Sequence, residues 1–307
     1  ASTTQPFSKR ALNNHRAWVP GGDLTDAYIR KFARSGQKLA ELALSDGRRQ
    51  ISSLNPRRDG GVLVTGPIEQ IGSRNGTWLA SISPEGKLAW EKTLGLPARA
   101  AIIEGYDRNI GFIGIRKVDS TGQKSKLEVV FWLFSPQGDV LAEHVIHPNA
   151  DTPYGSKPAD RYSIETSPDG FFALLRWYDS SSRSPLSVIK LSPTGDIQWN
   201  VTLKHTAAQW PERPKVWEYC DQQQVILENG DLLTTCSLKD EIVLSRLDRK
   251  SGIETQQRVA LPSCHDKRPA LITPFPVDEH SILLFGTRAS GNVGASCAWL
   301  AELALKI

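Results

Sequence analysis

Five basic residues stand at one recurring place in the sequence, directly before the apolar segment that opens each of five consecutive repeats. They are Arg49, Arg99, Arg161, Lys215 and Arg268. Cations that gather around one opening raise the local concentration of an anionic ligand. We therefore predict that these side chains form an anion-attracting funnel at the mouth of a channel. The alternative is that each cation pairs with a nearby carboxylate, such as Glu104, Glu165 or Glu218, and only stabilises its repeat.

A segment that contains tryptophan and arginine, residues 205–217, is the second candidate for binding. Trp and Arg are the residue types that dominate the energetics of protein interfaces. The residues that we expect to contact a partner here, together with one histidine from a later connection, are His205, Trp210, Arg213, Lys215, Trp217 and His265. The alternative is that both tryptophans turn inward and cap the core.

No motif in the sequence specifies a reaction, and we assign no catalytic residue. The six histidines are not spaced as metal ligands, although His265 and Asp266 beside Cys264 leave a metal site open. The sequence contains neither a glycine-rich phosphate loop nor a G-x-S-x-G nucleophile elbow. We therefore expect no metal and no cofactor.

Composition narrows the classes of partner. Of the 307 residues, 39% are apolar and 23% are charged, which is typical of a folded globular chain. The formal net charge of +4 is too small to make nucleic acid the expected partner. No apolar run is long enough for a transmembrane helix. We expect another protein or an anionic ligand instead.

A repeat in the sequence indicates which elements position these residues. An apolar strand, a tight turn closed by glycine and a second apolar strand recur along the chain. The turn glycines are Gly36, Gly86, Gly138, Gly195 and Gly252. Three of the turns read Ser-Pro-x-Gly, in which Pro presets φ and Gly takes the left-handed position. Another pair of short strands precedes each complete hairpin, so the sequence predicts an all-β propeller of four-stranded antiparallel blades.

The number of blades and the way in which the ring closes are less well specified. Counting hairpins gives six blades, and five or seven stay open as alternatives. The last repeat lacks its fourth strand, and residues 16–20 (Arg-Ala-Trp-Val-Pro) resemble a fourth strand of another repeat. We expect them to pair with the C-terminal strand and so remove the open edges. Residues 1–25 are then an N-terminal segment, and residues 26–307 are a single propeller domain.

Two stretches resemble known propeller repeats. Residues 59–95 are similar to the blades of bacterial secreted β-propeller repeats, which follow the pattern DGGxxVxG, xWLxxxxxxG and LxWEKxxG. Residues 247–252 (Leu-Asp-x-x-Ser-Gly) resemble the tryptophan-docking repeats of quinoprotein-type propellers. The resemblance covers about residues 26–305. It implies the fold and no particular activity, because such repeats serve scaffolds, binders and enzymes alike.

The connections between strands differ in length. The turn after the first strand and the turn after the third strand of each repeat are tight, whereas the other connections are long and polar. In a propeller the long connections emerge on one face, and function concentrates in such loops. The long connections are residues 66–77, 117–126, 147–161, 204–215, 261–268 and 288–296.

Four cysteines lie in the last third of the chain, and none forms a C-x-x-C pair. They are Cys220, Cys236, Cys264 and Cys297. An even number without metal spacing predicts two disulfides in an oxidising compartment, and four free thiols are the alternative. We predict the pairs Cys220–Cys236 and Cys264–Cys297, each within one blade, although hairpin counting places Cys236 opposite Gln223 rather than Cys220.

The start of the sequence agrees with export. The small polar residues Ala-Ser-Thr-Thr-Gln-Pro are typical of a mature end left by signal-peptide cleavage, and a truncated chain is the alternative. We expect a periplasmic or secreted, non-catalytic binding module: a scaffold, an inhibitor or an immunity-type protein that uses its long-connection face. The alternative is an enzyme with its site at the basic channel mouth, such as a lyase, a glycoside-acting enzyme or a quinone-dependent dehydrogenase.

Overall fold

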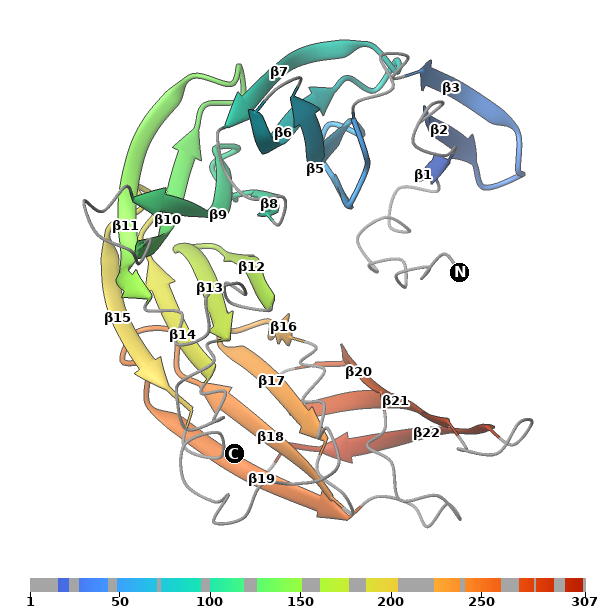
Figure 1. The fold of residues 1–307 in the computed structure, drawn as a ribbon. Coiled ribbons are helices and arrows are strands. Elements are labelled where there is room, and N and C mark those ends of the chain that lie inside the picture. Colours follow the sequence, from blue (N-terminus) through green and yellow to red (C-terminus); the bar gives the residue numbers. More distant parts are fainter. Residues whose placement is uncertain are drawn as a thin grey trace. The chain divides into compact units, whose positions relative to one another are not determined.

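The described part of the chain is built from β-strands alone. The computed structural model describes residues 16–21, 28–43, 49–70, 73–94, 100–118, 126–150, 161–176, 186–203, 224–237, 241–260, 271–278, 280–289 and 296–305. These residues form strands β1 to β22 in six sheets of three or four strands (Figure 1). Every residue pairing between neighbouring strands that the structure gives is antiparallel. The all-β prediction is therefore confirmed.

The chain divides into two compact units, which we describe separately. Unit 1 comprises residues 1–171 and 192–196, and unit 2 comprises residues 172–191 and 197–307. The division runs through the fourth sheet, whose first strand belongs to unit 1.

Unit 1 contains three whole sheets and the start of a fourth. The first sheet has the order β1 (Arg16–Gly21), β2 (Tyr28–Ala33), β3 (Lys38–Ala43). The second has the order β4 (Ser53–Pro56), β5 (Val62–Gln70), β6 (Ser73–Ile82), β7 (Leu88–Leu94). The third has the order β8 (Ala100–Glu104), β9 (Ile110–Val118), β10 (Lys126–Phe134), β11 (Val140–Ala150).

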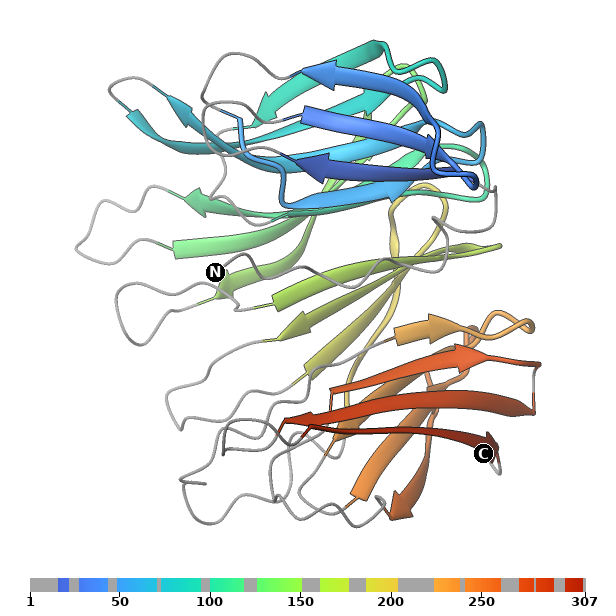
Figure 2. The same ribbon diagram turned by 90° about the vertical axis from the view of Figure 1, so that its right-hand side faces the viewer.

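The remaining sheets follow the same rule, in which strands adjacent in sequence are neighbours. The fourth sheet has the order β12 (Arg161–Ser167), β13 (Gly170–Arg176), β14 (Leu186–Leu191), β15 (Ile197–Thr202). The fifth has the order β16 (Gln224–Ile226), β17 (Leu232–Ser237), β18 (Glu241–Leu247), β19 (Glu254–Ala260). The sixth has three strands, β20 (Leu271–Pro276), β21 (Ser281–Ala289) and β22 (Ser296–Ala304). Figure 2 shows the strands of each sheet running side by side.

The turn glycines adopt the predicted conformation. Each of the five has a positive φ, from +69° at Gly252 to +93° at Gly195. The turns after the first strands use the same device at Gly60, Gly170 and Gly230. In the third sheet that place is taken by Arg108, with a φ of 69°. A left-handed backbone costs a non-glycine residue about 1–2 kcal/mol, so this turn is locally strained.

The N-terminal strand contradicts the predicted closure. β1 pairs with β2, with Arg16 opposite Ala33 and Gly21 opposite Tyr28, and therefore completes the first sheet rather than the last. Only six residues separate the two strands, so a hairpin closes at a small entropic cost, whereas pairing with the C-terminal strand requires a closure over most of the chain.

The long connections are shorter than predicted in unit 1. β5 and β6 pair as far as Gln70 and Ser73, so most of residues 66–77 belongs to a hairpin. β9 and β10 pair as far as Val118 and Lys126, and β11 continues to Ala150. Backbone pairing does not require apolar side chains, so a polar stretch extends a strand beyond the core. Residues 204–223 and 261–270 lie outside the described residues.

The second sheet is buried on both faces. On β5, Val62 and Val64 cluster with Ile29 of β2, whereas Leu63 between them clusters with Phe112 of β9. Successive side chains of a strand point to opposite faces, so this sheet lies between the first and the third. The sequence reads as a continuous apolar run there for that reason.

The fifth sheet has the same arrangement within unit 2. Leu232 of β17 clusters with Phe172 and Leu174 of β13. The next residue, Leu233, clusters with Ile282 and Leu284 of β21 on the other face. Sheets that stack face to face in this way are typical of propeller blades.

A repeated contact joins the outer strand of one sheet to the glycine turn of the next. In unit 1, Trp90 Nε1 on β7 donates a hydrogen bond to the Pro136 carbonyl oxygen at 3.0 Å. A Cβ added to Gly138 in the same turn would lie 2.8 Å from the Trp90 ring. Between the first two sheets, Ala40 takes the place of Trp90, and a Cβ on Gly86 would lie 2.6 Å from its side chain.

Unit 2 repeats the contact with another tryptophan. Trp199 Nε1 on β15 donates to the Arg249 carbonyl oxygen at 3.1 Å, and a Cβ on Gly252 would lie 2.8 Å from the Trp199 ring. Hydrogen bonds from the Ser251 hydroxyl and backbone to Asp248 hold this turn and keep the pKa of the Asp248 carboxyl below its usual value. At both places a tryptophan ring on an outer strand packs against the glycine turn of the next sheet.

We expect Gly138→Ala to destabilise the protein by about 2 kcal/mol more than Gly36→Ala. Both glycines have a positive φ, +92° and +84°, so both variants carry the same backbone strain. Only Gly138 has a neighbour within reach, because nothing lies within 4 Å of a Cβ at Gly36. Displacing the Trp90 ring adds lost packing and a lost hydrogen bond. Urea unfolding of the two variants measures the difference, and equal losses would contradict the docking role of Trp90.

Candidate functional site

Most of the residues predicted to bind a partner fall outside the described residues. This group consists of Arg99, Lys215, Arg268, Trp210, Arg213, Trp217, His205 and His265, together with Cys220 and Cys264. Arg161 begins β12 and Cys297 lies in β22, but only the backbone of each is described. Convergence of the five cations therefore stays a prediction.

Arg49 is the one member of the cation set with a described side chain. Its backbone forms a bridge with Ile68, and its Nη2 lies 3.0 Å from Glu91 Oε1 on β7. Its guanidinium carbon lies 5.9 Å from the centre of the Trp78 ring. At this position the cation is paired with a carboxylate of its own sheet, as the alternative interpretation has it, although the partner is Glu91.

Cys236 is the one cysteine with a described side chain. It is buried on β17 and disulfide-bonded. Its partner is not among the described side chains, so both predicted pairings stay predictions. The register of this hairpin corrects the sequence count by one residue, because Gln224 lies opposite Thr234 and not opposite Thr235.

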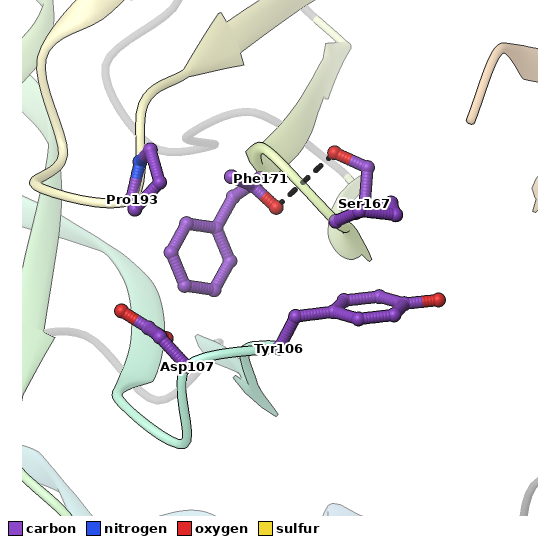
Figure 3. Close-up of a pocket in the computed structure, with 7 residues that line it drawn as sticks. Tyr106, Asp107, Ser167, Phe171 and Pro193 are labelled. Atoms are coloured by element: carbon purple, nitrogen blue, oxygen red, sulfur yellow. Dashed lines mark hydrogen bonds between the residues drawn. The ribbon is translucent and has the colours of Figure 1, made fainter.

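A small hollow opens in unit 1 where tight turns of two neighbouring sheets meet (Figure 3). Tyr106 and Asp107 come from the β8–β9 turn, and Phe171 and Pro193 come from the fourth sheet. The volume of the hollow is about 20 Å³. That is room for about one water molecule, whereas pockets for organic ligands measure about 300–1,000 Å³. The hollow is therefore too small to be a substrate site.

The rim of the hollow is fixed by polar contacts. Arg58 Nη1 donates to the Tyr106 carbonyl oxygen at 2.8 Å, and the Arg58 guanidinium carbon lies 4.2 Å from the Tyr106 ring centre. Across the hollow, the Ser167 hydroxyl donates to Asp169 Oδ1 at 2.8 Å. Tyr106 is nevertheless 44% exposed. The rim therefore presents an aromatic ring that is fixed in position beside the Arg58 guanidinium.

A buried ion pair underlies this rim. Arg57, in the turn after β4, is 3.4 Å from Glu104 Oε1 at the end of β8, and both residues are buried. Arg57 also donates to the Ser81 hydroxyl at 2.6 Å, and the Arg58 backbone N–H donates to Glu104 Oε2 at 2.7 Å. Each charge is thus bonded on more than one side, as buried ions require. The pair joins the inner strands of the second and third sheets.

A buried lysine makes an equivalent link between the first and second sheets. Lys31 of β2 is 1% exposed, and its Nζ donates to the carbonyl oxygens of Gly60 at 2.8 Å and Pro84 at 2.7 Å. The two acceptors belong to the two tight turns of the second sheet, so a single ammonium group holds both turns at one end of the sheet.

The third sheet carries a charged cluster that the sequence did not reveal. Arg116 of β9 lies 2.9 Å from Glu128 of β10 and also pairs with Glu143 of β11. Trp132 Nε1 donates to Glu143 Oε2 at 2.9 Å. The hydrogen bond with Glu128 first, and then that with Glu143, raise the pKa of Arg116 above its usual value. The Arg116 cation is therefore already paired with two carboxylates of its own sheet.

Two further features of the described residues bear on chemistry. Among them, no group of three or more His, Cys, Asp or Glu side chains is arranged to hold a metal ion. The same residues include no helix that is long and apolar enough to cross a membrane.

Comparison with known proteins supports the fold and no activity. Neither a family model nor a curated protein matches the chain. A protein of unknown function from Dyadobacter fermentans DSM 18053 is similar in structure, with a TM-score of 0.50 and 11% identity, over 96% of this chain and 92% of that chain. This chain has a β-propeller-like fold. At that identity the likeness says nothing of function.

Two further solved structures match with lower TM-scores. Prolyl oligopeptidase B from Galerina marginata matches with a TM-score of 0.43 and 11% identity, over 97% of this chain and 40% of that chain. A thermostable family-43 glycoside hydrolase matches with a TM-score of 0.34 and 12% identity, over 62% and 63% of the two chains.

We expect Glu104→Gln to cost about 3 kcal/mol of unfolding free energy, because it removes the buried counter-ion of Arg57 and leaves this cation only the less buried Asp59, whose Oδ2 lies 3.1 Å away. The matched control is Glu241→Gln, which breaks the exposed pair with Arg258 at 2.6 Å and should cost less than about 1 kcal/mol. Chemical denaturation of both variants makes the comparison. A loss at Glu104 as small as that at Glu241 would show that the pair between the sheets contributes little.

Proposed function

We propose that this chain is a non-catalytic binding module that is exported to the periplasm or secreted. It presents the surface of its sheets and their connections to another protein or to an anionic ligand. The observation that carries the proposal is a set of exposed apolar side chains at the start of the outer strands. They are Leu39, Leu88, Val140 and Leu141 in unit 1, and Ile197 and Ile253 in unit 2.

These side chains recur at one place in the repeat. Each lies one to three residues after a turn glycine, on the strand at the end of its sheet or, for Ile253, directly before that strand, and each is 43–65% exposed. A single exposed aliphatic residue is ordinary. Its recurrence shortly after the turn glycine in five sheets supports a role in contact with a partner, because exposed apolar patches mark interaction sites.

The long-connection face stays part of this proposal. The residues expected there, Trp210 and Arg213 among them, suit a protein partner, and Arg99, Lys215 and Arg268 suit an anionic one. The exposed residues at the outer strands and the residues expected on the long-connection face are different residues, so variants can tell the two sets apart. We also propose that the six sheets are the blades of one propeller, as the burial of the second and fifth sheets on both faces supports.

Capture of the partner and titration of the purified pair test the proposal. Wild-type protein should retain one partner from a native periplasmic or secreted extract, and Leu141→Lys should weaken that binding at least tenfold if the outer strands carry it. The paired change Trp210→Ala with Arg213→Ala tests the long connections. Tyr106→Ala, at an exposed ring that belongs to neither set, should leave binding unchanged.

The following result would contradict the binding proposal. If purified protein carries a stoichiometric metal or organic cofactor, or turns over a glycoside or quinone-linked substrate, and no variant affects partner binding, the binding proposal is wrong. The enzyme alternative with a site at the basic mouth would then replace it.

A further inference from the structure

We propose that the open edge of the sixth sheet pairs with the same edge of a second copy, so that two chains form a weak symmetric dimer through β22. Among the described residues, the sixth sheet has three strands, in the order β20, β21, β22, and none beside β22, whereas the second to fifth sheets have four. The place beside β22 corresponds to the place that β7, β11, β15 or β19 occupies beside its neighbour.

The backbone of β22 offers its free groups in a regular order. Leu305 N, just after the strand, donates to the His280 carbonyl oxygen on the β21 side, at 2.7 Å. The preceding Ala304 carbonyl oxygen faces away from β21 and accepts from the Gln257 side chain at 3.2 Å. Because N–H and C=O groups alternate in direction along a strand, residues 298, 300 and 302 point their backbone groups outward.

The side chains on this strand favour another apolar strand as a neighbour. Leu300 is 63% exposed, and its cross-strand partner Phe285 on β21 is 40% exposed. Glu302 is the one charged residue between Ser296 and Ala304. Edge strands are usually protected by several charges, by proline or by a covering element, and a strand that is nearly free of charge invites pairing.

A second copy of the same strand fits this edge without conflict. In an antiparallel pairing centred on Leu300, a residue that precedes Leu300 in one copy lies opposite the residue that follows Leu300 by the same number of positions in the other copy. Leu300 then lies beside Leu300 of the second copy, and Glu302 lies opposite Ala298 rather than another carboxylate. Residues with outward backbone groups meet one another, so the hydrogen bonds can form, and the two-fold symmetry makes the contact closed.

The contact is small, so the dimer should be weak. One strand and two apolar side chains from each chain bury less than the roughly 1,200 Å² of a stable complex. We therefore expect monomer and dimer to exchange at micromolar concentration.

Sedimentation velocity over about 1–300 μM tests the inference on the wild-type chain and three variants. Leu300→Lys should stay monomeric throughout, because it places two cations side by side. Ala298→Pro should also stay monomeric, because it removes an outward N–H and leaves the bonds to β21 intact. The control Ile253→Lys, at a 65% exposed position directly before β19, should dimerise as the wild type does.

Every other outcome overturns the inference. A wild type that is monomeric at all concentrations shows that the edge does not recruit a copy. A dimer that survives Ala298→Pro, or that Ile253→Lys abolishes equally, uses a different surface. A monomer whose unfolding temperature falls by more than about 5 °C with Leu300→Lys, but not with Ile253→Lys, shows that Leu300 is covered within its own chain.

Discussion

The structure depends on a contact between a side chain on the outer strand of one sheet and the glycine turn of the next sheet. The glycine with a positive φ in each turn has no Cβ, and the Trp90 or Trp199 ring lies where that Cβ would be in close contact with it. The indole N–H then reaches a carbonyl oxygen that the turn leaves open. The buried links through Lys31 and Arg57 join neighbouring sheets of unit 1 in addition to this contact.

The sequence predicts those parts of the fold that depend on local chemistry. Glycine at the end of each tight turn and alternating apolar residues beside it locate the hairpins, because both rules act within about ten residues. The turn between β8 and β9 is an exception, because Arg108 rather than glycine takes the left-handed position there. The placement of β1 was wrong, because a resemblance in residue pattern does not distinguish one sheet edge from another.

The polar contacts between sheets could not be predicted in the same way. Arg57 and Glu104 are 47 residues apart in the sequence and meet only because two sheets stack. Arg49 and Glu91 are 42 residues apart and meet across the face of one sheet. Which carboxylate each cation meets depends on the register of several strands at once. The repeated exposed apolar residues were visible in the sequence, but their exposure depends on which strand is outermost.

Amide hydrogen exchange in a Trp90→Ala variant tests the central contact most directly. The amides of Ser135 and Gly138, which bond to Asp139 and Ser135 across the β10–β11 turn, report on the sheet that receives the tryptophan. If docking holds this turn, their exchange should accelerate at least tenfold, while the equivalent amides Ser192 and Gly195 in the fourth-sheet turn, which packs on His144, keep their rates. Exchange that accelerates only within β6 and β7, the strands around Trp90 itself, would contradict the account.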